Sequence, residues 1–127
     1  MKIKQVTTQK APAAIGPYSQ AMRLDTLVFC SGQIGLDPLR GELVDGGIEA
    51  ETRQTLANLE AVLTASKSSF SSVLRMTVYL LDLADFAVVN RIYAEVLGEA
   101  RPARSTVGVA ALPRGARIEI DAIASRD

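Results

Sequence analysis

The alternation of hydrophobic and polar residues changes period along the chain, and each period predicts an element. Residues 48–63 carry apolar side chains at spacings of three and four, which is typical of an amphipathic helix. Residues 73–81 switch to a period of two, which predicts a strand. A second helical pattern begins at about Asp85 and ends near Gly98. Its expected buried side consists of Phe86, Val89, Tyr93, Val96 and Leu97.

Shorter patterns predict the remaining strands. Residues 3–8 fit a short edge strand, and residues 19–24 and 27–32 fit a hairpin around a short turn. Residues 104–111 and 117–124 predict two strands at the end of the chain. The order is therefore β-ββ-α-β-α-ββ, an α+β fold in which two helices pack on one face of a mixed or antiparallel sheet. No linker or repeat interrupts it, so we expect residues 1–127 to form a single domain.

Two helices can cover only one face of such a sheet. The second face of residues 73–81 still carries Val73, Tyr79 and Leu81. Either this face meets water with an unusually apolar surface, or it contacts another subunit. The pattern favours a subunit.

Net charge, cysteine content and the lengths of apolar runs limit the partners and the cellular location that we expect. Fourteen basic and fourteen acidic residues cancel, so no overall field attracts nucleic acid or an anionic membrane. Cys30 is the only cysteine, which excludes an intrachain disulfide and suits a reducing compartment. The N-terminal lysines are not followed by an apolar segment, and no apolar run approaches the ~20 residues of a membrane helix. These features predict a soluble, cytoplasmic protein.

Several kinds of chemistry lack their usual residues. The chain has no histidine, which excludes a Ser-His-Asp triad and an imidazole-ligated metal. No glycine-rich loop of the kind that binds nucleotide phosphates is present. We therefore expect no metal and no cofactor. Catalysis would depend on carboxylate, guanidinium, hydroxyl, phenol or backbone amide groups.

Arg104 is the first candidate for such chemistry. Strand alternation separates it from Ser105, Val107 and Val109, which we expect to form the core face. Arg104 would then lie on the opposite face, where its planar guanidinium could bind a carboxylate through two parallel hydrogen bonds. The alternative is a surface arginine at the end of a strand.

Glu119 is the second candidate. If residues 104–111 and 117–124 pair as a hairpin, Glu119 can share a sheet face with Arg104. A carboxylate there could hold a water molecule and transfer protons. The alternative is an exposed carboxylate that pairs with Arg117 or Arg75.

Other candidates lie at irregular backbone. Tyr18 follows a Gly-Pro pair and could contact a flat ligand, although a lone tyrosine more often packs. Ser31 and Gly32 end a strand, and Gly32 would let a ligand approach backbone amides, unless this is a simple strand exit. Asn90 could reach a pocket from the second helix. Cys30 is expected to be a buried strand residue rather than a reactive thiol.

Five segments, in order, resemble the RidA/YjgF family of reactive-intermediate deaminases. They are "APAAIGPYSQA", "FCSGQIG", "DFAVVNRIYAEVL", "RPARSTV" and "IEIDAIA", and together they span essentially the whole chain. The resemblance implies a chorismate-mutase-like fold and a homotrimer with clefts between its subunits. It also implies an activity: hydrolysis of 2-iminobutanoate and 2-iminopropanoate, which arise from reactive enamines, to 2-oxo acids and ammonia.

The family's functional positions coincide with residues of this chain. The resemblance implies that Arg104 binds the substrate carboxylate and that Glu119 lies near the attacking water. Tyr18, Ser31 and Asn90 match further positions of the cleft. Arginine at position 104 matches the members that deaminate these imines.

The chain departs from the family pattern beside this arginine. Many relatives read "RSCVEV" where this chain reads "RSTVGV", so Thr106 replaces a cysteine and Gly108 a glutamate. Hydrolysis by water needs no thiolate, so we expect activity to survive. Thr106 would change the shape of the pocket and the range of substrates.

Two other functions fit the same residues. One is a regulatory trimer that binds 2-oxo or 2-imino acids without converting them, through the same Arg104. The other is a ribonuclease or translation inhibitor with a basic patch made of Arg101, Arg104, Arg114 and Arg117. Zero net charge, and only six aromatic residues, none placed among those arginines, argue against nucleic acid as a partner.

Overall fold

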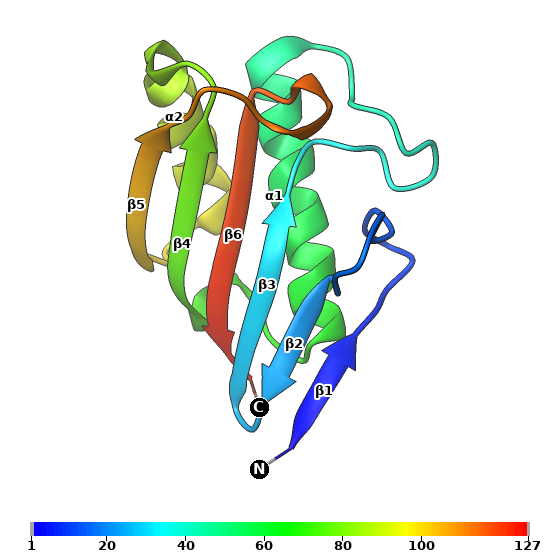
Figure 1. The fold of residues 1–127 in the computed structure, drawn as a ribbon. Coiled ribbons are helices and arrows are strands. Elements are labelled where there is room, and N and C mark those ends of the chain that lie inside the picture. The colour runs from blue at the N-terminus through cyan, green and yellow to red at the C-terminus, as the bar shows by residue number, and fades with distance from the viewer. Residues whose placement is uncertain (1, 127) are drawn as a thin grey trace.

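The computed structural model describes residues 2–126 and consists of one mixed sheet with two helices on one face (Figure 1). The helices are α1 (Gly47–Ala65) and α2 (Phe86–Leu97). The strands, in sheet order, are β1 (Ile3–Val6), β2 (Ala21–Leu24), β3 (Leu27–Gln33), β6 (Ile118–Ser125), β4 (Val73–Leu80) and β5 (Ala103–Gly108). The predicted element order and fold class are confirmed.

The pairing of the last strands differs from the prediction. β6 lies between β3 and β4 and is antiparallel to both, whereas β5 is the edge strand and pairs parallel with β4. The hairpin of residues 104–111 and 117–124, on which a common face for Arg104 and Glu119 depended, therefore does not form. A parallel pair needs a crossover connection, and α2 between β4 and β5 provides it. Closeness in sequence suggested a hairpin, but this crossover decides the pairing.

The core fills the space between α1, α2 and one face of the sheet. Leu56, Leu59 and Leu63 of α1 are fully buried, as are Ile118 and Ile120 of β6. Burial of each such side chain contributes roughly 1.5–3 kcal/mol. Among the residues described, neither helix is long and apolar enough to cross a lipid bilayer.

An irregularity at the start of β4 changes which residues reach the core. The register with β6 shifts between Val73 and Arg75, so Val73 is buried and Leu74 is half exposed. Our assignment of Val73 to the second face was wrong, because a bulge reverses the alternation at that point. Phe86 also differs from its expected burial and is 39% exposed at the start of α2.

The face of the sheet away from the helices, here called the outer face, keeps large apolar side chains in contact with solvent. Alternation places Met22, Phe29 and Val107 on it, and these side chains are 37%, 42% and 40% exposed. Both helices lie on the other side (Figure 1). The sheet therefore has an apolar second face, as predicted: Tyr79 lies on it as expected, Val73 does not, and Met22, Phe29 and Val107 add to it.

Candidate active site

Arg104 lies on the helix-covered side of the edge strand β5. Its register partner on β4 is Met76, which is fully buried, so both side chains point toward the helices. The expectation that Arg104 lies opposite the core face is therefore wrong. Val107, assigned to the core from its apolar character, is exposed on the outer face. An edge strand under the end of a helix layer can place a charged side chain on the core side without burying it completely.

Three side chains of α2 fix the Arg104 guanidinium. Its Nη1 donates a hydrogen bond of 2.9 Å to Oδ1 of Asn90. Its central carbon lies 4.8 Å from the ring centroid of Tyr93 and 5.6 Å from that of Phe86. Cation–π contacts of this length hold the guanidinium plane near the rings. Because arginine has five N–H donors, most remain available to an anion.

These residues border a cavity of about 400 Å³. Its lining consists of Asn90, Tyr93, Ala94, Arg101, Pro102 and Arg104. The Tyr93 hydroxyl oxygen is buried and has no hydrogen-bond partner in residues 2–126. Burial raises the pKa of Tyr93, and the nearby charges of Arg104 and Arg101 oppose this only in part. The cavity thus offers two guanidinium groups and a protonated phenol, all of which donate hydrogen bonds to an anion.

Glu119 lies on the outer face of β6, against the backbone of β3. A Cβ atom at position 32 would overlap the carboxylate of Glu119, so a larger residue there would displace this side chain from its place against β3. Burial raises the pKa of Glu119, and the neighbouring charge of Asp121 raises it further. A carboxyl group with a raised pKa is better suited to carry a proton near neutral pH.

Tyr18 and Ser31 belong to the same part of the molecule as Glu119. Ser31 follows Cys30, where the pairing of β3 with β6 becomes irregular, and its hydroxyl donates a 2.6 Å hydrogen bond to the carbonyl of Ser19. That bond ties the strand to the irregular segment that carries Tyr18. The Tyr18 side chain is 52% exposed, so its ring is open to a ligand or another chain.

The candidate residues therefore form two groups. The arginine group consists of Asn90, Tyr93, Arg104 and Thr106, the last on the same side of β5 as Arg104. The glutamate group consists of Tyr18, Ser31, Gly32 and Glu119. Met76 pairs with Arg104 and Tyr79 pairs with Glu119, and these two positions of β4 point to opposite faces. Within one chain Arg104 and Glu119 do not share a face, contrary to the prediction.

The alternative partners of Glu119 are otherwise engaged. Arg117 forms an ion pair of 3.7 Å with Asp85, and Arg75 donates a hydrogen bond of 2.8 Å to the Ser105 hydroxyl. Among residues 2–126, Glu119 forms no ion pair.

The four arginines considered for nucleic acid do not act as one patch. Arg101 and Arg104 border the same cavity, whereas Arg114 donates to the carbonyl of Gly41 and Arg117 pairs with Asp85. The described residues contain no group of three or more Cys, Asp or Glu side chains arranged to hold a metal ion.

Cys30 is buried, as expected. Burial, with a smaller contribution from Asp121, raises the pKa of its thiol to about 12. A thiol with so high a pKa is not a nucleophile at neutral pH.

Sequence reasoning missed two members of the cavity, Tyr93 and Arg101. Tyr93 was assigned to packing, although it lies three residues after Asn90 and therefore on the same side of α2. Arg101 precedes β5, and its Nη1 donates to the carbonyls of Gly98 and Ala100. The helical spacing from Asn90 could have identified Tyr93, but no pattern predicts how Arg101 folds back.

Comparison with known proteins gives consistent matches over the whole chain. The family model described as Endoribonuclease L-PSP matches residues 8–126. A mouse protein named 2-iminobutanoate/2-iminopropanoate deaminase is 51% identical over 121 residues, which is 95% of this chain and 90% of that protein.

Solved structures agree in fold. The YjgF gene product from E. coli is 42% identical, with a TM-score of 0.92 over 98% of this chain and 99% of its own. E. coli TdcF with bound serine is 41% identical, with a TM-score of 0.93 over the same shares of the two chains.

Proposed function

Because this chain belongs to the Endoribonuclease L-PSP family, which is the family of the RidA/YjgF proteins, we propose that it hydrolyses short 2-imino acids to 2-oxo acids and ammonia. The observation that carries the proposal is the Arg104 guanidinium, fixed beside a cavity of about 400 Å³ in a chain 51% identical to a mouse 2-iminobutanoate/2-iminopropanoate deaminase. Such imines are small and carry one carboxylate, which suits a cavity of this size beside a fixed guanidinium.

Arg104 binds the substrate carboxylate. Asn90 and Tyr93 hold the guanidinium before the substrate arrives, so little conformational freedom is lost on binding. The unpartnered Tyr93 hydroxyl and Arg101 add donors at the same cavity. The bound serine of E. coli TdcF supports this reading, because serine is also a small carboxylate with nitrogen on the adjacent carbon.

The complete site forms between copies of the chain in a homotrimer. Arg104 and Glu119 lie on opposite faces of one sheet, so they can act on one substrate only if a neighbouring copy supplies one of them. The apolar outer face, with Phe29 and Val107, supports the same assembly, since an isolated chain would expose it to water. The glutamate group of one copy then faces the arginine group of the next.

Hydrolysis proceeds through addition of water to the C=N bond. With the carboxylate held by Arg104, Glu119 of the neighbouring copy removes a proton from a water molecule whose oxygen bonds to the imine carbon. The same carboxyl group delivers that proton to the imine nitrogen, which gives a carbinolamine with a hydroxyl and an amino group on one carbon. Glu119 then transfers the hydroxyl proton to the amino nitrogen, so the C–N bond breaks and ammonia leaves as the C=O bond forms. Gly32 lets the carboxyl group of Glu119 lie against the β3 backbone, and Ser31 fixes that segment through its hydrogen bond to the Ser19 carbonyl. Thr106 shapes the pocket next to Arg104.

The test measures imine decay in a coupled assay. A threonine dehydratase generates 2-iminobutanoate, and semicarbazide captures whatever imine remains. We expect wild type to accelerate decay and Arg104→Ala to reduce kcat/KM by about 100-fold or more, because the carboxylate loses a charge-assisted bidentate partner. The matched control is Arg91→Ala, an exposed α2 arginine paired with Glu49, which should behave as wild type.

Two outcomes would contradict the proposal. Equal decay with wild type and Arg104→Ala would remove Arg104 from the reaction. Tight binding of 2-oxobutanoate by wild type, with no acceleration of imine decay, would favour a regulatory binding trimer. A ribonuclease gains no support from the geometry, because Arg114 and Arg117 are engaged elsewhere.

We also propose a cytoplasmic location. It rests on the single cysteine, which is a buried thiol, and on the small, metabolic character of the substrate.

A further inference from the structure

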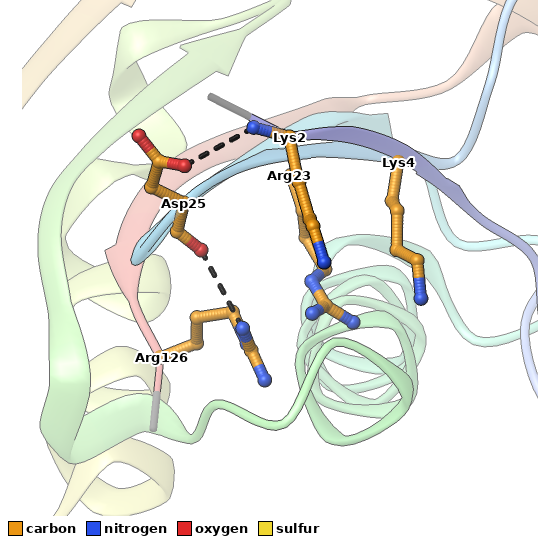
Figure 2. A pocket seen from close by; sticks show the side chains of 5 residues that line it. All are labelled: Lys2, Lys4, Arg23, Asp25 and Arg126. Atoms are coloured by element: carbon orange, nitrogen blue, oxygen red, sulfur yellow. Dashed lines mark hydrogen bonds between the residues drawn. The ribbon is translucent and has the colours of Figure 1, made fainter.

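A second set of cationic side chains surrounds a cavity next to both ends of the chain. Lys2 and Lys4 of the β1 region, Arg23 of β2, Asp25 and Arg126 line a volume of about 280 Å³ (Figure 2). We call it the terminal cationic pocket. It belongs to neither group of the candidate active site.

The sheet register makes these side chains converge. Lys4 pairs with Arg23, and Arg23 pairs with Val28, which is fully buried on the helix side, so Lys4 and Arg23 share that side. The backbone N–H of Arg126 donates a 2.8 Å hydrogen bond to the carbonyl of Thr26, which places Arg126 beside the turn between β2 and β3. Four cations from three separate segments therefore surround one space (Figure 2).

Their charge is not balanced within residues 2–126. None of Lys2, Lys4, Arg23 and Arg126 forms an ion pair there, whereas Arg53 and Arg91 on the helices do. The carboxylate of Asp25 accepts from the backbone N–H of Lys2, and Arg126 reaches only the Asp25 carbonyl, at 3.5 Å. The Nε atoms of Arg23 and Arg126 are both buried without a hydrogen-bond partner. A buried donor without an acceptor is costly, and an anion in the pocket would supply the acceptor.

The partial negative charge at the C-terminal end of α1 is too small to neutralise the cations of the terminal cationic pocket. Arg126 also lines a second cavity, of about 410 Å³, together with Lys67, which follows the C-terminal end of α1. The end of a helix carries only about half a negative charge. Four cations against the single carboxylate of Asp25 leave three positive charges around the pocket. Most of that charge remains for a ligand.

The second cavity indicates the shape of the ligand. Besides Lys67 and Arg126, its lining consists of Ser68, Ser69 and Ser72. Hydroxyl groups suit the polar part of a sugar or alcohol, and arginine pairs suit the oxygens of a phosphate. No aromatic side chain lines either cavity, so neither offers the stacking surface that single-stranded nucleic acid uses.

We propose that the terminal cationic pocket binds a small phosphate monoester. The phosphate lies between Arg23 and Arg126, and the hydroxyl-bearing remainder extends along the serine-lined cavity. The two negative charges of a monoester at neutral pH match the surplus of cations. This site is independent of imine hydrolysis.

The experiment compares ribose 5-phosphate with ribose by amide chemical-shift titration of the intact protein. We expect ribose 5-phosphate to shift the amides of Lys4, Arg23, Ser69 and Arg126, and ribose at the same concentration to leave them unchanged. The affinity should fall as salt rises, because part of the attraction is screened. Shifts confined to the surroundings of Arg104 would overturn the proposal, as would equal responses to the two sugars.

Single substitutions then localise the site. Lys4→Gln, on an exposed side chain that the fold does not need, and Arg126→Gln should each weaken binding about three- to tenfold. Arg91→Gln removes the same charge far from the pocket and should leave affinity within about twofold. Imine decay should be unaffected in all three variants. Equal affinity of Lys4→Gln, Arg126→Gln and Arg91→Gln would refute the site, and affinity that rises steadily with the length of an RNA oligonucleotide would assign the pocket to nucleic acid instead.

Discussion

The arginine group and the glutamate group lie on opposite faces of the same sheet and differ in what holds their charged side chains in place. Arg104 is held by side chains of its own chain, an amide at 2.9 Å and two aromatic rings, so its geometry is complete in one copy. The Glu119 carboxylate lies against the backbone of Gly32 on β3. Burial and the neighbouring Asp121 raise its pKa. In the proposed mechanism the first group recognises the substrate and the second group moves the proton. Because the two groups lie on opposite faces, that mechanism allows recognition in one chain but needs two chains for the chemistry.

The largest expected effect separates the two groups directly. Glu119→Gln removes the proton carrier and leaves the arginine group intact, so kcat should fall on the order of 10²- to 10⁴-fold while 2-oxobutanoate still binds. Arg104→Ala should instead lose the binding of 2-oxobutanoate as well. Stopped-flow imine decay and calorimetric titration measure the two quantities. If Glu119→Gln lost ligand affinity as strongly as Arg104→Ala, the division of roles would be wrong.

Mixing the two inactive proteins tests whether each site takes one residue from each of two copies. After subunit exchange in mild denaturant, an equal mixture of Arg104→Ala and Glu119→Gln should regain about a quarter of the wild-type activity, because that share of sites pairs an intact arginine with an intact glutamate. The readout is imine decay before and after exchange. No recovery from a mixture shown to have exchanged subunits would place both residues in one chain's site.

A smaller effect is expected from the phenol of the arginine group. Tyr93→Phe keeps the ring beside Arg104 but removes the unpartnered hydroxyl, and should weaken 2-oxobutanoate binding about three- to tenfold. Tyr93→Leu also removes the cation–π contact and should weaken it further. Identical affinities for wild type and Tyr93→Phe would mean that the hydroxyl does not contact the ligand.

The smallest effect concerns stability and pH. The folded protein raises the pKa of Glu119, so the charged carboxylate destabilises the fold above that pKa and the neutral carboxyl group does not. Glutamine imitates the neutral form. Glu119→Gln should therefore raise Tm by a few degrees at neutral pH, and the difference should shrink as pH falls through the raised pKa and disappear below the ordinary pKa of a glutamate. A difference in Tm that stays constant with pH would show that charge is not its cause.

Most helices and strands could be predicted from the period of apolar residues. The errors occurred where the structure depends on contacts between segments that are distant in sequence, or on a single extra residue. Long apolar stripes identified α1 and α2 because their spacing repeats over several turns. The partner of β5 could not be read in this way, since strand pairing depends on the crossover through α2 and not on the residues of β5. The bulge beside Val73 was missed for a related reason, because one extra residue leaves no mark in a short pattern.

The candidate site shows the same limit. Residue pattern and family resemblance together selected Arg104, Glu119 and Asn90 from a single sequence, and the structure brings Asn90 to Arg104. The sequence could not tell on which face of the sheet each side chain lies. That depends on how β4 pairs with both β5 and β6, and the residues of one strand do not determine this pairing.

The only sulfhydryl of the chain offers a practical consequence. Cys30 is buried, and its thiol, with a pKa of about 12, stays protonated at neutral pH. An alkylating reagent can therefore label the protein only during moments when the middle of β3 opens. Labelling kinetics followed by mass spectrometry would time those openings in the unmodified protein, with no engineered probe.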